Sequence, residues 1–314
     1  MTGTERKAYS DKKAKKQGEQ KRNVGTKTDA RQLSFADIEN WEVPPVSGNS
    51  VEIGTLPSPI WTETKAQLIQ NYLRLFLYIT RHGVYIDGFA GPQDKENPQS
   101  WAAKLVLELT PPWMKSFFLC EVNKSSHSDL LSMIQSQRKI SGRKITDRLG
   151  DFNQWIDPVL ATGSITDKTA TFALLEQRST ECHWSTVKKL AAHKQGSTKI
   201  ELFYFFPTGW IHRAISETKD KSILDAWWGD ESWRQIPTLS QDQASALCLR
   251  RIQALGYRDV KSWPISAREF GEGRTMYHMI HATDHLEAPK LMYRAYRNLI
   301  GGVPAGEQTK FAFE

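Results

Sequence analysis

The sequence has few cysteines and no long apolar run. Its 314 residues include Cys120, Cys182 and Cys248, and no two of these form a Cys-X-X-Cys pair. This spacing excludes a disulfide-stabilised scaffold and a zinc ribbon, and it fits a reducing cytoplasm. No segment approaches the roughly 18 apolar residues that cross a bilayer, and the polar first residues contain no signal-peptide core. We therefore expect a cytoplasmic protein that does not bind membranes.

The excess of positive charge is concentrated in the first part of the chain. The sequence carries 42 Lys or Arg and 35 Asp or Glu, for a formal charge of +7. Ten basic and four acidic side chains fall within residues 1–32, so the remaining residues together are close to neutral. A body that binds duplex nucleic acid over a whole face is therefore not expected.

Composition divides the chain into three parts. Residues 1–32 have almost no large apolar side chains and are predicted to form a disordered basic arm. This arm is either a solubilising tail or an attachment to nucleic acid or another polyanion. Residues 33–60 are rich in Pro, Ser and Gly and predict an extended lead-in. Hydrophobic residues make up 39% of the chain, so residues 61–314 are expected to form a single domain with one large core.

Apolar spacing in this domain predicts alternating helices and strands. The expected helices are 66–81, a segment through 130–134, and 184–192, and the expected strands are 84–87, 117–121, 169–176, 200–206, 262–267 and 275–283. Helical, Trp-rich sequence fills about 210–255, and a Gly-Glu-Gly turn separates the last two strands. We therefore predict an α/β, Rossmann-like fold whose mostly parallel sheet ends in an antiparallel hairpin. This is the layout of class I methyltransferases.

A glycine turn follows the first predicted strand. It reads Asp87-Gly88-Phe89-Ala90-Gly91, and its small residues allow the backbone to approach a ligand closely. In a methyltransferase-like fold, an acidic residue at this position faces the amino-acid half of S-adenosylmethionine. The five residues are therefore candidate cofactor contacts. The alternative is a tight strand-to-helix turn that binds no ligand.

Two further segments carry candidate cofactor contacts. Glu121 ends the next strand, where a carboxylate can accept hydrogen bonds from both hydroxyls of a ribose. Asp151 and Asn153 belong to a Gly-Asp-Phe-Asn segment, at the place where the methyltransferase layout has a loop that contacts adenine. The alternatives are an ordinary carboxylate at a strand end and a common Gly-Asp turn.

Catalysis in this fold is usually built at the end of the fourth strand, which here reads Glu176-Gln177-Arg178. Glu176 could orient or deprotonate a nucleophile, and Arg178 could bind a phosphate or a carboxylate. A salt bridge at the rim of the sheet is the alternative. The segment lacks the Pro-Pro-aromatic loop common in amino-methylating enzymes that act on nucleic acid. The chain also has no Pro-Cys dipeptide, which excludes the nucleophile of cytosine C5 methylation.

A histidine-rich segment near the end of the domain suggests a metal site. On a helix, His278, His281 and His285 would share a face, with Asp284 nearby. The alternation of the segment favours a strand, which directs His278 and His281 to opposite faces, so no metal site is predicted. Four tryptophans are expected in the core rather than as stacking platforms: Trp227, Trp228, Trp233 and Trp263.

Taken in order, these motifs resemble the three-Cys-motif partner proteins (TcmP), a bacterial, methyltransferase-like family. The matching segments are VYIDGFAGP, FLCEVN, GDFN, FALLEQRSTECHW, KIELFYFFPTGWIHRAI and MYHMIHATDHLEAPKLMYRAY. The resemblance implies an S-adenosylmethionine-dependent transferase whose methyl acceptor is not defined. The family is named after a neighbouring gene product with a three-cysteine motif, so such a protein encoded nearby is a candidate partner.

Two departures from the family pattern bear on activity. Gln93 stands where a glycine often extends the first turn, which could narrow the entrance to the cofactor site. Glu176-Gln177-Arg178 stands where many relatives read Asp-Pro-Phe/Tyr-Gly and a subset reads Asp-Gln-Arg. The sequence therefore supports a methyltransferase in which Glu176 and Arg178 act on the acceptor. The alternative is a non-catalytic, nucleotide- or nucleic-acid-binding accessory protein of a mobile-element or defence system.

Overall fold

The computed structural model describes residues 60–61, 65–137, 139–196, 198–266 and 275–300. The predicted arm, nearly all of the lead-in and the Gly-Glu-Gly turn lie outside the described residues. Within them, one sheet has the strand order β1-β7-β8-β6-β5-β2-β3-β4. The strands are β1 (Ile60–Trp61), β2 (Gly83–Asp87), β3 (Met114–Glu121), β4 (Lys144–Leu149), β5 (Thr171–Leu175), β6 (Glu201–Phe206), β7 (Asp259–Ser266) and β8 (Thr275–Thr283).

The strand directions confirm the predicted fold class. From β4 to β6 the neighbouring strands pair in parallel, whereas β8 is antiparallel to both β6 and β7. The short β1 pairs in parallel with β7 at the edge. This is a methyltransferase-like Rossmann fold with an antiparallel end.

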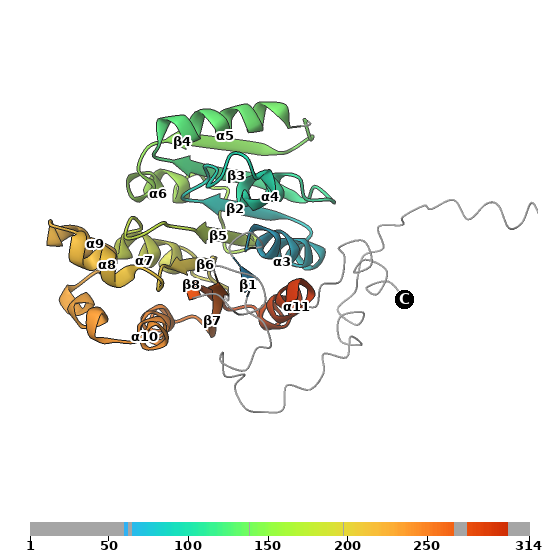
Figure 1. The fold of residues 1–314 in the computed structure, drawn as a ribbon. Helices are drawn as coiled ribbons and strands as arrows, with labels where there is room; N and C mark the ends of the chain where they lie inside the picture. Colours follow the sequence, from blue (N-terminus) through green and yellow to red (C-terminus); the bar gives the residue numbers. More distant parts are fainter. Residues whose placement is uncertain (1–59, 62–64, 138, 197, 267–274, 301–314) are drawn as a thin grey trace, which may run out of the picture. The chain divides into compact units, whose positions relative to one another are not determined.

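Helices cover both faces of the sheet (Figure 1). They are α3 (Lys65–Thr80), η3 (Pro98–Ser100), α4 (Ala102–Leu107), α5 (Lys124–Ser136), α6 (Phe152–Leu160), α7 (Trp184–Ala192), α8 (Ile211–Glu217), α9 (Lys221–Trp228), η4 (Glu231–Thr238), α10 (Gln241–Gln253) and α11 (Ala288–Ile300). Side chains of α3, α4, α5 and α11 pack on one face, and those of α6 to α10 pack on the other. The predicted helices at 66–81, 184–192 and within 210–255 are confirmed.

Strand β6 shows why its sequence is apolar from Leu202 to Phe206. Phe203 and Phe205 point into the core under α3, whereas Leu202, Tyr204 and Phe206 point into the core on the other face. All five side chains are almost completely buried, and each such burial stabilises the fold by about 1.5–3 kcal/mol. A strand covered by helices on both faces needs apolar residues at every position.

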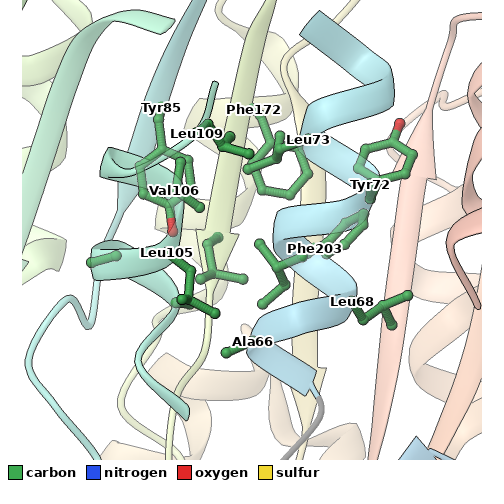
Figure 2. Close-up of a cluster of buried hydrophobic side chains, with 14 of the residues drawn as sticks. Ala66, Leu68, Tyr72, Leu73, Tyr85, Leu105, Val106, Leu109, Phe172 and Phe203 are labelled. Carbon is green, nitrogen blue, oxygen red and sulfur yellow. The ribbon is translucent and has the colours of Figure 1, made fainter. Parts of the chain in front are cut away.

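Helix α3 forms the centre of the first core. Its apolar residues recur at helical spacing, so one side of the helix faces the sheet. Figure 2 shows Leu73 of α3 next to Phe172 of β5, with Phe203 of β6 beneath the helix. The Tyr72 ring centroid lies 5.1 Å from that of Phe203 and 6.0 Å from that of Phe172. This aromatic contact fixes the helix over the middle of the sheet.

The second core contains the tryptophans of the helical segment. Trp227 and Trp228 are at most 1% exposed, and Trp227 stacks on Phe206 with ring centroids 6.0 Å apart. Trp233 is likewise buried, whereas Trp263 belongs to the first core. The prediction that these residues are core residues is confirmed. Of the helices in the described segments, none is long and apolar enough to cross a membrane.

Several elements are not predicted by apolar spacing. Strand β4 reads Lys-Ile-Thr-Asp-Arg-Leu and lies at the sheet edge with mostly exposed side chains, so it has no apolar run. Helix α4 has six residues, which is too short for a helical repeat to emerge. Helix α6 contains Pro158, a residue that argues against a helix interior. Strand β7 begins at Asp259, earlier than the predicted Ser262.

Candidate functional site

Three acidic residues meet at the carboxyl edge of the sheet. Strand β2 lies between β3 and β5, and all three are parallel, so their last residues lie at the same edge. Asp87 ends β2, Glu121 ends β3, and Glu176 directly follows β5. Glu176 and Glu121 both act electrostatically on Asp87. The fold therefore brings together the three strand-end carboxylates that the sequence analysis singled out.

Asp87 is the most deeply buried of the three, with 1% of its surface exposed. Its Oδ1 accepts the N–H of Phe89 at 3.0 Å, and its Oδ2 accepts the hydroxyl of Tyr85 at 2.9 Å. Burial raises the pKa of Asp87 to about 7, and Glu176 adds to the rise, whereas the hydrogen bonds from Phe89 and Tyr85 oppose it. The carboxyl group therefore titrates near neutral pH, and a cation bound beside it would favour its ionised form.

Protein side chains approach the turn after β2 closely at both glycines. A Cβ atom at Gly88 would lie 2.6 Å from the ring of Phe152, and one at Gly91 would clash with the carboxylate of Glu121. Phe89 is half-buried and packs near Phe152, with ring centroids 6.4 Å apart. Packing alone therefore requires both glycines, so they do not by themselves indicate a ligand.

Ala90 attaches the same turn to its neighbours. It is 1% exposed, and its N–H donates to the Cys120 carbonyl at 2.7 Å. Its own carbonyl accepts the indole N–H of Trp101 at 2.7 Å. These bonds hold the turn between the end of β3 and the start of α4, which fixes the backbone beside the three carboxylates.

Glu121 has unused acceptor capacity. Its Oε2 accepts the N–H of Gly91 at 3.0 Å, and its Oε1 accepts the N–H of Asn123 at 2.7 Å. A carboxylate offers about four lone-pair sites, so each oxygen can accept one further hydrogen bond. The next residue, Val122, is 67% exposed and presents an apolar surface beside the carboxylate. An acceptor for hydroxyls next to an apolar surface suits a nucleoside.

Asp151 and Asn153 join α6 to the connection between β5 and α7. Asp151 caps α6, and its Oδ1 accepts both the backbone N–H and the side-chain amide of Asn153 at 2.8 Å. The Asn153 amide also donates to the Glu181 carbonyl and accepts from the His183 N–H and the Thr186 hydroxyl. These contacts use both amide hydrogens and both lone pairs of Asn153. The cofactor role expected for both residues stays a prediction.

Replacing Asn153 by alanine should lower the free energy of unfolding by roughly 2–3 kcal/mol, because the partly buried His183 N–H and Thr186 hydroxyl lose their acceptor. Urea unfolding of Asn153→Ala measures this loss. Gln154→Ala changes the exposed neighbouring residue and should alter stability by no more than about 0.5 kcal/mol. Equal stability of the two variants would show that the Asn153 side chain does not hold the two elements together.

A buried ion pair lies at the end of β5. The Nζ of Lys65, in the first turn of α3, is 2.5 Å from both Glu176 Oε1 and Gln93 Oε1. Gln93 Nε2 in turn donates to Glu176 Oε1. The side chains of Lys65 and Glu176 are only 2% and 7% exposed, and Lys65 Nζ lies 5.1 Å from the ring centroid of Tyr277. Glu176 therefore forms the salt bridge that the sequence left open, and its predicted catalytic role stays a prediction.

The two residues after Glu176 differ in exposure. Gln177 is fully buried, donates to the Phe205 carbonyl at 3.2 Å and accepts the Cys182 N–H at 3.0 Å, so it joins β5 to β6. Arg178 is exposed, and its carbonyl accepts the indole N–H of Trp210 at 2.9 Å. Its guanidinium forms no ion pair with any described residue. Its expected contact with an anionic group stays a prediction.

A small pocket lies between the glycine turn, the start of α4 and the end of β5. It contains about 220 Å³ of empty space, part of it open to solvent. Its walls include residues of all three elements: Asp87, Phe89, Ala90, Gly91, Gln93, Ser100, Trp101, Ala102, Ala103 and Glu176. The side chain of Gln93 forms part of the wall, where it contacts Lys65 and Glu176.

Sequence reasoning missed two residues at this edge. Lys65 begins α3, and its partner Glu176 is far away in the sequence, so only the fold reveals the pair. Val122 directly follows Glu121, the last residue of β3. An apolar residue at this position, just after the carboxyl end of a strand, could have been recognised in the sequence as a candidate ligand contact. Its 67% exposure distinguishes it from the buried strand residues before it.

The histidines of β8 are used within the two cores. His278 lies 2.8 Å from the hydroxyl of Thr208, through Nδ1, and His281 lies 2.9 Å from Oε1 of Glu201, through Nε2. The prediction that these histidines occupy opposite faces of a strand is confirmed. Within the described ranges, no group of three or more His, Cys, Asp or Glu residues could hold a metal ion.

Comparisons with known proteins are distant. No protein-family model and no curated protein matches this chain. Among solved structures, the chain is similar to "a putative methyltransferase from Thermobifida fusca YX", with 7% sequence identity and a TM-score of 0.39. The alignment covers 71% of this chain and 83% of that one. A similarity this weak does not support any assignment of function.

Proposed function

We propose that this chain is a cytoplasmic S-adenosylmethionine-dependent methyltransferase related to the three-Cys-motif partner proteins. The proposal rests on the position of Asp87, Glu121 and the turn between 87 and 91 at one edge of the sheet. In open parallel sheets, ligands bind outside the carboxyl ends of the strands, where the strand order reverses. Here the chain passes from β2 to β3 on one side and later to β5 on the other, so this edge is that reversal point.

The residues at this edge fit the two halves of the cofactor. Glu121 can accept further hydrogen bonds from a ribose diol, and Val122 offers an apolar surface for a purine base. Asp87 and Glu176 line the pocket beside the turn, and because Lys65 already pairs with Glu176, the Asp87 carboxylate is the group that would favour a cationic part of the ligand. The pocket contains about 220 Å³ of empty space, so we propose that it holds part of the cofactor and that the remainder lies over Glu121 and Val122.

Methyl transfer requires mainly positioning from the protein. The sulfonium of the bound cofactor supplies an already activated methyl group, so alignment with the acceptor provides most of the rate. Lys65 and Gln93 hold the Glu176 carboxylate in one orientation at the pocket wall. From there Glu176 would orient a donor group of the acceptor, and the exposed Arg178 would meet an anionic part of it.

Replacing Glu121 by alanine should weaken the binding of S-adenosylmethionine by about 10- to 100-fold, because the hydrogen bonds to the ribose are lost. Isothermal titration calorimetry of the purified protein and the variant measures the change. Glu108→Ala removes an exposed carboxylate that pairs with Lys104 within the chain and should bind as the original protein does. Equal affinity of all three proteins would place the ribose elsewhere and contradict this site.

One observation favours a non-catalytic accessory protein as a second candidate. Glu176 already has a buried partner in Lys65, and Gln93 narrows the pocket, so the site could bind a nucleotide without transferring a methyl group. Under this alternative the protein binds adenosine nucleotides as well as S-adenosylmethionine. Calorimetry with ATP separates the two proposals, because a site in which Asp87 meets a cationic part of the cofactor should reject a triphosphate.

Two binding partners are proposed, and both proposals are compatible with either function. We propose that a three-Cys-motif protein binds this chain, and that the basic residues within 1–32 attract nucleic acid. Residues 1–32 lie outside the described residues. Co-purification of the two proteins, and nucleic-acid retention by the chain with and without residues 1–32, would test them.

A further inference from the structure

A second pocket lies at the opposite edge of the sheet from Asp87 and Glu176. It contains about 480 Å³ of empty space, partly open to solvent, between α3, the starts of β5 and β6, the end of β8 and the start of α11. Strand β6 has six residues, so its two ends lie about 20 Å apart. The pocket is therefore separate from the proposed cofactor site.

A buried carboxylate forms the floor of this pocket. Glu201 is 5% exposed and accepts three hydrogen bonds, from the hydroxyl of Tyr72, from Nε2 of His281 at 2.9 Å and from the hydroxyl of Thr283 at 3.1 Å. Burial and the neighbouring Glu201 raise the pKa of Tyr72 well above its ordinary value, so its hydroxyl remains a donor. Three donors therefore use most of the acceptor capacity of Glu201.

Asp284 and His285 lie at the rim of the pocket, and both accept hydrogen bonds from backbone N–H groups. Asp284 accepts the N–H of Lys199 at 3.0 Å through one oxygen and the N–H of Arg258 at 2.9 Å through the other. His285 Nδ1 accepts the N–H of Glu287 at 3.2 Å, so its neutral ring carries the hydrogen on Nε2. The side chain of His285 therefore offers a donor to the pocket, not an acceptor.

Lys194 is a buried cation with unused donors. It lines the pocket, is 5% exposed, and its ammonium has a single hydrogen-bond partner among the described residues, the carbonyl of Thr169. An ammonium has three donors, so two of them have no acceptor within the described part of the chain. Burial lowers the pKa of Lys194 to about 8, with Asp167 and Glu201 opposing the shift. The group is therefore mostly charged at neutral pH.

The remaining walls are apolar. Phe76 and Ile79 come from α3, and Leu291 comes from α11. Phe76 and Leu291 are buried, whereas Ile79 is half-buried. A pocket with hydrogen-bond donors on one side and apolar side chains on the other suits a ligand that has both an acceptor group and an apolar group.

We propose that this pocket binds a small anion that carries an apolar or aromatic group. A carboxylate or phosphate of the ligand pairs with Lys194, and its apolar part lies against Phe76, Ile79 and Leu291. Such a charge-assisted pair satisfies the donors that the described residues leave unused. The proposal is independent of methyl transfer, because none of these residues lies at the carboxyl edge.

Calorimetric titration with benzoate, phenyl phosphate and benzyl alcohol, each up to about 10 mM, tests the proposal. At least one of the two anions should bind, and the neutral alcohol should bind at least about tenfold more weakly. The tighter anion identifies the ligand group as a carboxylate or a phosphate. Binding of neither anion, or equal binding of the alcohol, would overturn the proposal.

Two variants locate the binding. Lys194→Met keeps the length of the side chain and should weaken the binding of the tighter anion at least about tenfold. Lys168→Met, at an exposed position outside the pocket, should leave that affinity unchanged. Ile79→Trp fills the pocket from α3 and should abolish binding while thermal melting remains cooperative. Unchanged binding in Lys194→Met and Ile79→Trp would place the anion elsewhere and overturn the assignment.

Discussion

Replacing Lys65 by methionine should lower the free energy of unfolding by about 3–5 kcal/mol, because it leaves a buried carboxylate without its counter-charge. Lys65 Nζ lies 2.5 Å from Glu176 Oε1, and the two side chains are only 2% and 7% exposed. Gln93 would still donate to Glu176, but a single amide cannot replace the lost positive charge. For a domain of this size the loss corresponds to a fall in melting temperature of roughly 10 °C.

Two controls separate the buried charge from the loss of a lysine. The double variant Lys65→Met/Glu176→Gln removes both charges and should recover most of the stability, to within about 1 kcal/mol of the original protein. Lys189→Met breaks the exposed pair with Asp157, at 2.7 Å, and should cost less than about 1 kcal/mol. If Lys65→Met and Lys189→Met lose the same stability, the pair at the end of β5 does not behave as a buried ion pair.

Replacing Asp87 by asparagine should stabilise the protein increasingly as the pH rises from 5 to 8. Burial raises the pKa of Asp87 from 3.8 to about 7 in the folded chain. The folded state therefore binds more protons than the unfolded state in this interval, so the original protein loses stability as the pH rises through about 7. Asparagine cannot ionise, so the gain over the original protein should grow by about 2–3 kcal/mol between pH 5 and pH 8.

Urea unfolding of both proteins at several pH values measures this difference directly. Carbon NMR of labelled aspartate carboxyl groups adds a second measurement, because one resonance that titrates near pH 7 should disappear in Asp87→Asn. Tyr85 and Phe89, which donate to the carboxylate, can still pair with the asparagine amide, so the fold should be retained. Parallel stability curves for the two proteins would show that Asp87 is ionised throughout and not buried as described.

Helix α3 links the two pockets across the sheet. Its 16 residues extend about 24 Å. Lys65 in its first turn contacts Glu176 at the carboxyl edge, and Tyr72 contacts Glu201 under its middle. Ile79 near its end lines the second pocket. One amphipathic helix therefore carries apolar residues for the core and polar residues for two separate carboxylates.

Much of the fold could be predicted from the sequence because its central strands are buried on both faces. The run from Ile200 to Phe206 has no polar interruption other than Glu201, and it becomes β6. Strand β4 escaped detection because an edge strand with exposed Lys144 and Arg148 has no apolar signature. Predictions for the arm and for most of the lead-in concern residues outside the described ranges.

The candidate site was partly predictable for a different reason. Asp87, Glu121 and Glu176 each end a predicted strand, and parallel strands place their ends at one edge. What each carboxylate contacts depends on residues distant in the chain, so Lys65 could not be assigned to Glu176 beforehand. Likewise, the sequence could not reveal that the side-chain amide of Asn153 forms all four of its hydrogen bonds with other protein groups.

The central claim is that the edge formed by β2, β3 and β5 binds S-adenosylmethionine, and calorimetric titration of the purified full chain tests it most directly. We expect one cofactor molecule per chain with a Kd below about 1 mM. We also expect Glu121→Ala to weaken that binding while Glu108→Ala leaves it unchanged. Absence of binding at millimolar S-adenosylmethionine, in a protein that melts cooperatively, would contradict the claim.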